Sequence, residues 1–332
     1  MRQNTLLSHD LFEGIYGRAA LVTDIILYEE YPSRYLVYAR RLRRWIRGDW
    51  QLLPWLFPIV RTQNGMAPNR LSIINLWKVF DNLRRSLLPP TLWALLAAGW
   101  LFLPGSPLVW TLLVLLPSAL PIAAQTIQQG RHNHGRLTLK QILKPTQLPL
   151  TRWALAVLFL PYEELLMLGA IRTKLGRLLI ARKRLLQWTT AANIARSSGS
   201  NPHYEIWGEM AASLILTVVI GVTIAIFNPI ALWVALPLLM AWLVAPQVAY
   251  MISQPVTHIT TPLSENERRR VRRLARRTWA FFEQFAGPDD HWLPPDHFQE
   301  SPRGSVAHYT TPTNIGLFLV SGALGAWLYR RF

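Results

Sequence analysis

The sequence predicts a mainly α-helical integral membrane protein built around a multi-span helical bundle. Of its 332 residues, 51% are hydrophobic and only 16% are charged, which is well below the roughly 25% charged residues of a soluble domain. Several long apolar runs approach the length needed to cross about 30 Å of hydrocarbon. Lys and Arg number 35 against 18 acidic residues. Such an excess is typical of a cytoplasmic membrane face, where basic residues gather and meet anionic lipid.

Residues 1–70 precede the apolar runs and have the pattern of the end of a soluble α/β domain. The stretch Ala19–Tyr28 is partly β-branched and predicts a buried strand with a helical start. Glu29–Ser33 resembles a loop, and Tyr35 to about Trp55 is a predicted helix with arginines on more than one face. The chain has no cysteine, so disulfides contribute nothing to its fold.

The membrane region is predicted to cover residues 71–252. It begins with an amphipathic stretch, residues 72–86, in which apolar side chains such as Trp77 oppose basic ones such as Arg84. Such a helix lies in the membrane interface, although an ordinary surface helix is the alternative. Four spans are predicted, joined in pairs by uncharged turns at Pro104–Pro107 and Asn228–Pro229. These spans are residues 87–103, 107–124, 210–227 and 229–252.

A fifth apolar run, residues 153–170, contains Pro161 and the adjacent acids Glu163 and Glu164. A charged side chain at the bilayer centre costs roughly 2.5–3.5 kcal/mol. Basic segments flank this run on both sides, so a crossing here would place one of them outside, against the positive-inside rule. We therefore expect residues 153–170 to lie in the interface or against the bundle, and 172–189 to form another basic interfacial helix. Both termini are then cytoplasmic.

After residue 252 the character of the sequence changes. Ser264 is a predicted helix cap with acidic residues in the first turn, and the helix is expected to end at Gly287-Pro288. It combines many arginines with aromatic residues, which is compatible with nucleic-acid binding. A membrane-facing or domain-docking helix is the favoured interpretation after a membrane bundle. The loop-rich part that follows contains four polar residues of interest, Asp296, His297, Glu300 and His308.

Two charged motifs lie in the first 51 residues. The acidic one is Ser8–Gly14, which contains Asp10, and the cationic and aromatic one is Arg40–Gln51, which contains Arg44 and Trp45. Asp10 alone is explained equally well as an acid that complements a helix dipole. The arginines alone are explained as a basic face near the membrane. No Walker motif, dinucleotide-binding glycine pattern or metal-binding Cys/His spacing is present.

The chain resembles cyclic β-1,2-glucan synthases. Ser8–Gly14, Arg44–Gln51 and Trp77–Leu87 are similar to the end of the glycosyltransferase domain of that family. Leu293–Glu300 and Val306–Leu317 are similar to the start of the glucoamylase-like module that follows it. Residues 1–70 are then the C-terminal part of the glycosyltransferase domain, and residues 253–332 are a linker helix and the truncated start of the module. The chain corresponds to a minor middle part of such a synthase.

The resemblance implies roles for individual residues. Asp10 is the expected catalytic base that takes the proton of the attacking sugar hydroxyl. Arg44 and Trp45 match the Arg-Trp pair of the family, in which the arginine faces the departing diphosphate and the tryptophan faces the acceptor sugar. Arg41 stands where the family motif has Gln. Arg41 and Gln51 complete the expected substrate-binding set.

The implied function is part of a membrane glycosyltransferase that makes cyclic β-1,2-glucan from UDP-glucose at the bacterial inner membrane. The donor half, with a divalent Mg or Mn ion, is expected before Ser8, so the chain alone is expected to be incomplete and inactive. Its expected partners are UDP-glucose, the glucan chain, membrane lipid and separate N-terminal and C-terminal synthase pieces, without nucleic acid. The alternative is a non-catalytic, basic membrane scaffold or assembly subunit. Whether the chain acts as an enzyme stays open.

Overall fold

The computed structural model describes most of the chain, which divides into two compact units, Met1–Pro255 and Val256–Phe332. The described residues are 9–17, 23, 31–62, 65–132, 139–181, 202–255, 262–301 and 303–331. The structure is mainly α-helical, as the sequence predicts, and its few strands are short. The predicted strand at Ala19–Tyr28 lies, apart from Thr23, outside the described residues.

The predicted helix at 35–55 is two consecutive elements. These are α2 (Tyr35–Asp49) and a 3-10 helix, η1 (Trp50–Leu56), which contains Pro54. A short helix, α1 (Asp10–Tyr16), precedes them. Phe12 of α1 is 2% exposed and its ring lies 4.7 Å from that of Trp55 of η1, so packing holds this short helix in place.

A β-hairpin follows, although the sequence pattern does not predict one. Strands β1 (Ile59–Thr62) and β2 (Gly65–Pro68) pair antiparallel, with Ile59 opposite Pro68 and Thr62 opposite Gly65. Gly65 has a φ of 113°, a conformation that residues with a Cβ rarely adopt. Asn69 donates hydrogen bonds from its side chain to the carbonyls of Trp55 and Phe57 at 2.6 and 3.1 Å, which joins the hairpin to η1.

Helix α3 (Ile73–Leu101) unites the predicted interfacial helix with the first predicted span. It continues through Pro89 and Pro90. A proline has no backbone N–H, so neither residue can donate the helical hydrogen bond to the carbonyl of the preceding turn. Buried residues on both sides of the prolines hold the helix together: Val79 and Leu83 before them and Leu96 and Trp100 after them. Its 29 residues correspond to about 43 Å, longer than the hydrocarbon core of a bilayer.

Helix α4 (Pro107–His132) returns alongside α3 after a tight turn. Gly105 in this turn has a φ of 96°. The two helices approach closely at Gly99, where an added Cβ would lie 2.4 Å from the Cβ of Trp110. The indole of Trp100 donates a hydrogen bond of 2.9 Å to the hydroxyl of Thr111, also across the pair. The predicted hairpin between 87–103 and 107–124 therefore forms, while its crossing of a membrane stays a prediction.

The fifth apolar run contains a break. Helix α5 (Leu139–Leu158) and helix α6 (Leu160–Leu175) meet at Phe159, and the helical segments on the two sides of the break enclose an angle of 66°. Together they have the length and composition of a broken span or a re-entrant loop. Helix α6 packs against α2, α3 and α8. A π-helix, η2 (Gly176–Ala181), follows, and the rest of the predicted interfacial helix 172–189 lies outside the described residues.

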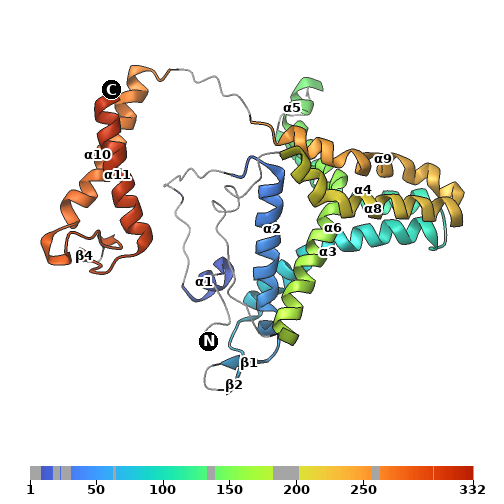
Figure 1. The fold of residues 1–332 in the computed structure, drawn as a ribbon, viewed down its shortest axis with the longest axis horizontal. Coiled ribbons are helices and arrows are strands. Elements are labelled where there is room, and N and C mark those ends of the chain that lie inside the picture. Colours follow the sequence, from blue (N-terminus) through green and yellow to red (C-terminus); the bar gives the residue numbers. More distant parts are fainter. Residues whose placement is uncertain are drawn as a thin grey trace. The chain divides into compact units, whose positions relative to one another are not determined.

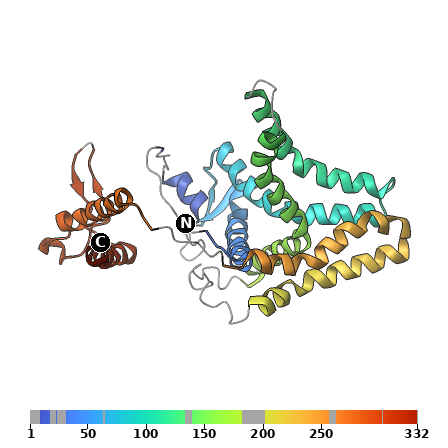
Figure 2. The same ribbon diagram turned by 90° about the horizontal axis from the view of Figure 1, so that it is seen from above.

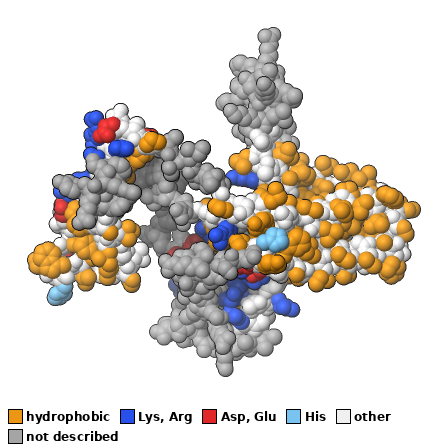
Figure 3. Space-filling view, turned by 45° about the horizontal axis from the view of Figure 1, so that its top comes forward, with side chains coloured by type: hydrophobic (Ala, Val, Ile, Leu, Met, Phe, Trp, Pro, Cys, Tyr) orange, Lys and Arg blue, Asp and Glu red, His pale blue; other side chains and the backbone are white. Residues whose placement is uncertain are grey.

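Helices α8 (Pro202–Phe227) and α9 (Pro229–Ile252) form a second hairpin, which runs beside α3 and α4 (Figures 1 and 2). Among the described residues these two helices are long and apolar enough to span a membrane, and the bent α5–α6 pair is a third candidate. The side chain of Asn228 at the turn donates a hydrogen bond of 2.9 Å to the carbonyl of Trp100, which joins the two hairpins at one end. Hydrophobic side chains cover the outer surface of this region (Figure 3), as expected for helices in lipid.

The topology can be tested with single cysteines because the chain has none of its own. Cysteines at Ser106 and Asn228 should react with a membrane-impermeant reagent added to intact cells, and a cysteine at Ser198 should react only after the cells are opened. The reason is that the two turns are uncharged whereas the intervening segments are basic. Labelling at Ser198 in intact cells, with none at Ser106, would overturn the four-span topology.

The second unit is a pair of helices with a small sheet between them in the chain. Its elements are α10 (Glu265–Phe285), η3 (Pro288–Asp290), β3 (Phe298–Gln299), β4 (Ser305–Val306) and α11 (Pro312–Arg331). The predicted serine cap is confirmed as a capping box between Ser264 and Glu267, and α10 ends before Gly287. Trp279 stacks on Phe318 of α11 with ring centroids 5.7 Å apart. Helix α11 begins within the stretch predicted as loop-rich and continues through the tail.

Candidate functional site

The site is built on α2, which is fixed to the membrane helices at several points. The backbone N–H of Tyr35, in the first turn of α2, donates a hydrogen bond of 2.9 Å to the hydroxyl of Ser253 at the end of α9. The guanidinium of Arg40 binds Glu205 and Glu209 of α8 at 2.7 and 2.9 Å. Burial by itself lowers the pKa of Arg40, but the hydrogen bonds that it donates to Glu209 and Glu205, together with their charges, outweigh this effect and raise the pKa. The helix is therefore held in a defined orientation.

One face of α2 contains most of the predicted substrate-binding residues. Arg44 and Trp45 follow Arg41 by three and four residues, and Gly48 follows them by four and three, which places all four on the same side of a helix. The guanidinium carbon of Arg41 lies 4.6 Å from the ring centroid of Trp45 and 5.7 Å from that of Tyr31. Trp45 is 40% exposed and Arg44 is partly buried. This face combines exposed aromatic surface with two cations.

Arg41 also has a donor without a partner. Within the described part of the chain its Nε atom is buried and makes no hydrogen bond. A buried donor left in this state costs on the order of 1–3 kcal/mol.

The acidic motif meets this face of α2. His9 Nε2 lies 3.2 Å from Asp49 Oδ1, and the same imidazole ring lies beside Gly48, where an added Cβ would be 3.5 Å from it. Asp10 follows His9 as the first residue of α1, and its side chain is exposed. The structure therefore brings the segment with Asp10 and the helix with Arg44 and Trp45 together, through His9.

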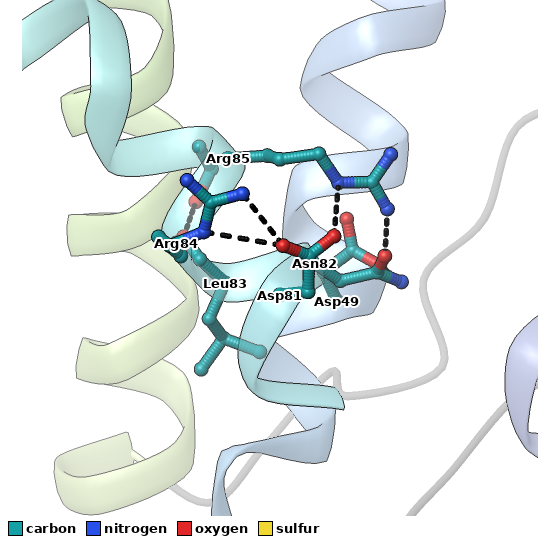
Figure 4. A network of polar contacts seen from close by, with 7 residues as sticks. Asp49, Asp81, Asn82, Leu83, Arg84 and Arg85 are labelled. Carbon is teal, nitrogen blue, oxygen red and sulfur yellow. Dashed lines mark hydrogen bonds and ion pairs between the residues drawn. The ribbon is translucent and has the colours of Figure 1, made fainter. Parts of the chain in front are cut away.

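Asp49 belongs to a polar network that joins three elements, and Figure 4 shows the part of it between α2 and α3. Its Oδ1 atom accepts a hydrogen bond of 2.9 Å from the side chain of Asn82 of α3. Asn82 in turn contacts Arg85, and Arg85 and Arg84 both pair with Asp81, at 3.4 and 2.7 Å. The network ties the end of α2 to α3 as well as to α1.

Sequence reasoning did not identify the role of Asp49 and Asn82. The signal was present, because both lie in segments that resemble the synthases, but the pattern of Trp77–Leu87 predicts only a surface or interfacial helix. Trp50 makes a second connection to α3, because its indole donates a hydrogen bond of 2.8 Å to the hydroxyl of Ser86. Trp77–Leu87 therefore supports the end of the helix that contains Arg44 and Trp45.

Gln51 lies apart from the other predicted residues. It is in η1 rather than α2, and only 8% of it is exposed. Its side chain belongs to the packed interior between η1 and its neighbours, so a substrate contact by Gln51 stays a prediction.

Three of the four polar residues singled out in the second unit make side-chain contacts in two groups: Asp296 and His297 in one, and His308 in the other. Asp296 accepts hydrogen bonds from His297 and from the side chain of Asn314, at 3.1 and 2.8 Å. These hydrogen bonds, with that of His297 the larger influence, hold the pKa of the Asp296 carboxyl below its usual value. His308 contacts Asp290 at 2.8 Å. Among the described residues of both units, no three His, Asp or Glu side chains come together in a way that would hold a metal ion.

Comparison with known proteins agrees with the resemblance. No model of a known family matches the chain. The chain is 36% identical over 327 residues, 97% of its length, to the cyclic beta-(1,2)-glucan synthase NdvB of Rhizobium meliloti (strain 1021). It spans only 11% of the length of that protein. Along nearly its whole length, the chain is therefore similar to one segment of that synthase.

Proposed function

We propose that this chain forms the acceptor side of a membrane glycosyltransferase that makes cyclic β-(1,2)-glucan from UDP-glucose. The similarity to the Rhizobium meliloti synthase supports the substrate class. The observation that supports the site is the contact of His9 with Gly48 and Asp49, because it positions the acidic motif against the face of α2 that contains the arginines and Trp45.

In the proposed reaction a hydroxyl of the growing glucan attacks the anomeric carbon of the donor glucose. Asp10 accepts the proton of that hydroxyl as the new glycosidic bond forms. The bond between the anomeric carbon and the β-phosphate oxygen breaks, and UDP leaves with the electron pair. Exposure of Asp10 suits this role, since the acceptor must reach the carboxylate from outside the packed helices.

The cations and the tryptophan of α2 have separate tasks. Arg44, assisted by Arg41, stabilises the negative charge that develops on the diphosphate, for which the planar guanidinium is suited. Trp45 offers its exposed ring to the acceptor sugar. The contact of Arg41 with Trp45 keeps the ring in a fixed position, so the two tasks are linked by one helical face.

The donor nucleotide and its divalent Mg or Mn ion are assigned to a different part of the synthase. The described residues contain no cluster of His, Asp or Glu side chains that fits a metal. The proposed partners are accordingly a donor-binding half, the glucan chain, membrane lipid and a C-terminal module. The proposed location is the bacterial inner membrane, with both ends of the chain in the cytoplasm.

Incorporation of labelled glucose tests the proposal. Membranes that contain this chain together with a donor-binding glycosyltransferase half should convert labelled UDP-glucose into β-1,2-linked glucan. Membranes with the donor half alone are the control and should release glucose by hydrolysis without elongation. Equal elongation in both membranes would show that the acceptor side lies elsewhere.

A further inference from the structure

The surface of α10 is divided into distinct faces. The face toward α11 contains Trp279 and Phe282, and the ring of Phe318 packs on both, with centroids 5.7 and 5.1 Å away. Arg268, Arg272 and Ala275 are less exposed than their neighbours and continue this face toward the start of the helix. The packing of the second unit therefore occupies only one side of α10.

A second face of α10 is formed by exposed arginines. At 100° per residue they cover an arc of about 120° on the helix. The five residues are Arg269, Arg270, Arg273, Arg276 and Arg277. Basic side chains are visible along the second unit in Figure 3 (left).

Among the residues that the structure describes, two of these five arginines pair with a carboxylate. Arg269 pairs with Glu265 at 3.7 Å and Arg276 with Glu283 at 2.7 Å. In the described ranges, no carboxylate lies within ion-pair distance of Arg270, Arg273 or Arg277. A run of like charges on one helix repels itself, so a face of this kind is most stable against a surface of opposite charge.

The third face of α10 is apolar and exposed. Leu274 is 66% exposed and Val271 is 38% exposed. At 100° per residue they lie between Arg270, at the edge of the arginine face, and Phe282, on the face that packs on α11. A helix with arginines next to exposed aliphatic side chains has the composition of helices that lie at a membrane surface.

Chain connectivity keeps this helix near a membrane. Helix α9, which is long and apolar enough to cross, ends at Ile252, and α10 begins about a dozen residues later at Glu265. A fully extended chain of that length reaches about 45 Å at most. Headgroups are therefore always within reach of α10. The linker keeps their local concentration around the helix high, which favours binding.

We infer that the arginine face of α10, with Leu274 and Val271 beside it, binds the headgroups of anionic lipids in the bilayer that contains this same chain. Arginine suits this ligand because its guanidinium forms paired hydrogen bonds with phosphate oxygens. The aliphatic residues enter the boundary between headgroups and acyl chains. This binding does not depend on whether the chain takes part in glucan synthesis.

The test uses the full chain in lipid nanodiscs, with one fluorescent label on a cysteine that replaces Gln284. This residue is exposed and borders the arginine face. Lipids with a quencher on the headgroup should quench the label strongly when phosphatidylglycerol is present and weakly in pure phosphatidylcholine, and high salt should abolish the difference. A label at Thr313, at the start of α11, is the control for general proximity.

A variant with Arg270, Arg273 and Arg277 all changed to Gln should lose the lipid-dependent quenching. Each arginine contributes about fivefold to the partition onto an anionic surface, so the loss should be on the order of a hundredfold. The matched control changes Arg70, Arg152 and Arg172 to Gln, which removes the same charge from exposed positions outside α10 and should leave the quenching at Gln284 in place.

Quenching that is equal in anionic and neutral nanodiscs would overturn the inference. A response of the label to an added oligonucleotide, together with none to phosphatidylglycerol, would overturn it in favour of nucleic acid. The comparison of lipids needs no arginine substitution and so decides the question even if the triple variant does not fold.

Discussion

Replacing Asp10 with Asn is expected to lower glucan elongation by about a hundredfold or more, because an amide cannot accept the proton of the acceptor hydroxyl. The measurement is incorporation of labelled glucose into glucan by membranes that also contain the donor half. The amount of variant protein in the membrane should be unchanged, since Asp10 is exposed and packing of α1 depends on Phe12.

Glu13 provides a matched control for Asp10. It is also exposed, lies in the same first turn of α1 and has the same charge. If Asp10 only complements the helix dipole, then Glu13→Gln and Asp10→Asn should have similar small effects, each below about 1 kcal/mol. Near-normal elongation by Asp10→Asn would return this residue to the structural role and would favour the scaffold interpretation.

Substitutions of Arg44 and Trp45 are expected to have different consequences. Arg44→Lys should weaken both turnover and inhibition by UDP, because lysine cannot reproduce the two parallel hydrogen bonds of a guanidinium with a diphosphate. The loss should be on the order of 1.5–3 kcal/mol, or roughly tenfold to a hundredfold. Trp45→Ala should impair elongation of the glucan and leave inhibition by UDP almost unchanged, because the ring is assigned to the acceptor.

Arg43 is the control for this experiment. It precedes Arg44 in α2 and is exposed, but it lies outside the face formed by Arg41, Arg44 and Trp45. Arg43→Lys should leave turnover and inhibition by UDP near those of the unmodified chain. If Trp45→Ala abolished inhibition by UDP while Arg44→Lys preserved it, the match of this stretch to the Arg-Trp motif would be wrong.

Features that depend on neighbouring residues were predictable from the sequence. The turn at Pro104–Pro107, the turn at Asn228–Pro229 and the cap at Ser264 all form where they are expected. The helical class of the protein and two of its apolar helices follow from composition and run length. In each case the interacting residues lie close together in the chain, so the local sequence is enough to predict the structure.

Features that depend on long-range packing were not predictable in the same way. The interfacial stretch and the first predicted span are one helix, α3, because buried residues on both sides of Pro89 and Pro90 outweigh the missing hydrogen bonds. The break at Phe159 differs, because Pro161 stands at the start of α6 and has no N–H to continue the hydrogen bonding of α5. The sequence contains that local signal, whereas the continuity of α3 depends on the helices that pack alongside it.

The candidate site shows the same division. The sequence by itself determined which residues belong to the acidic motif and which to the Arg-Trp motif, because each motif is a short run of adjacent positions. Only the tertiary structure decided that His9 contacts Gly48 and Asp49, that Asn82 binds Asp49, and that Ser253 accepts from Tyr35. The hydrogen-bonded pairs among these are separated by 40, 33 and 218 residues. Their meeting depends on how whole helices pack against one another, which the order of residues along one segment does not specify.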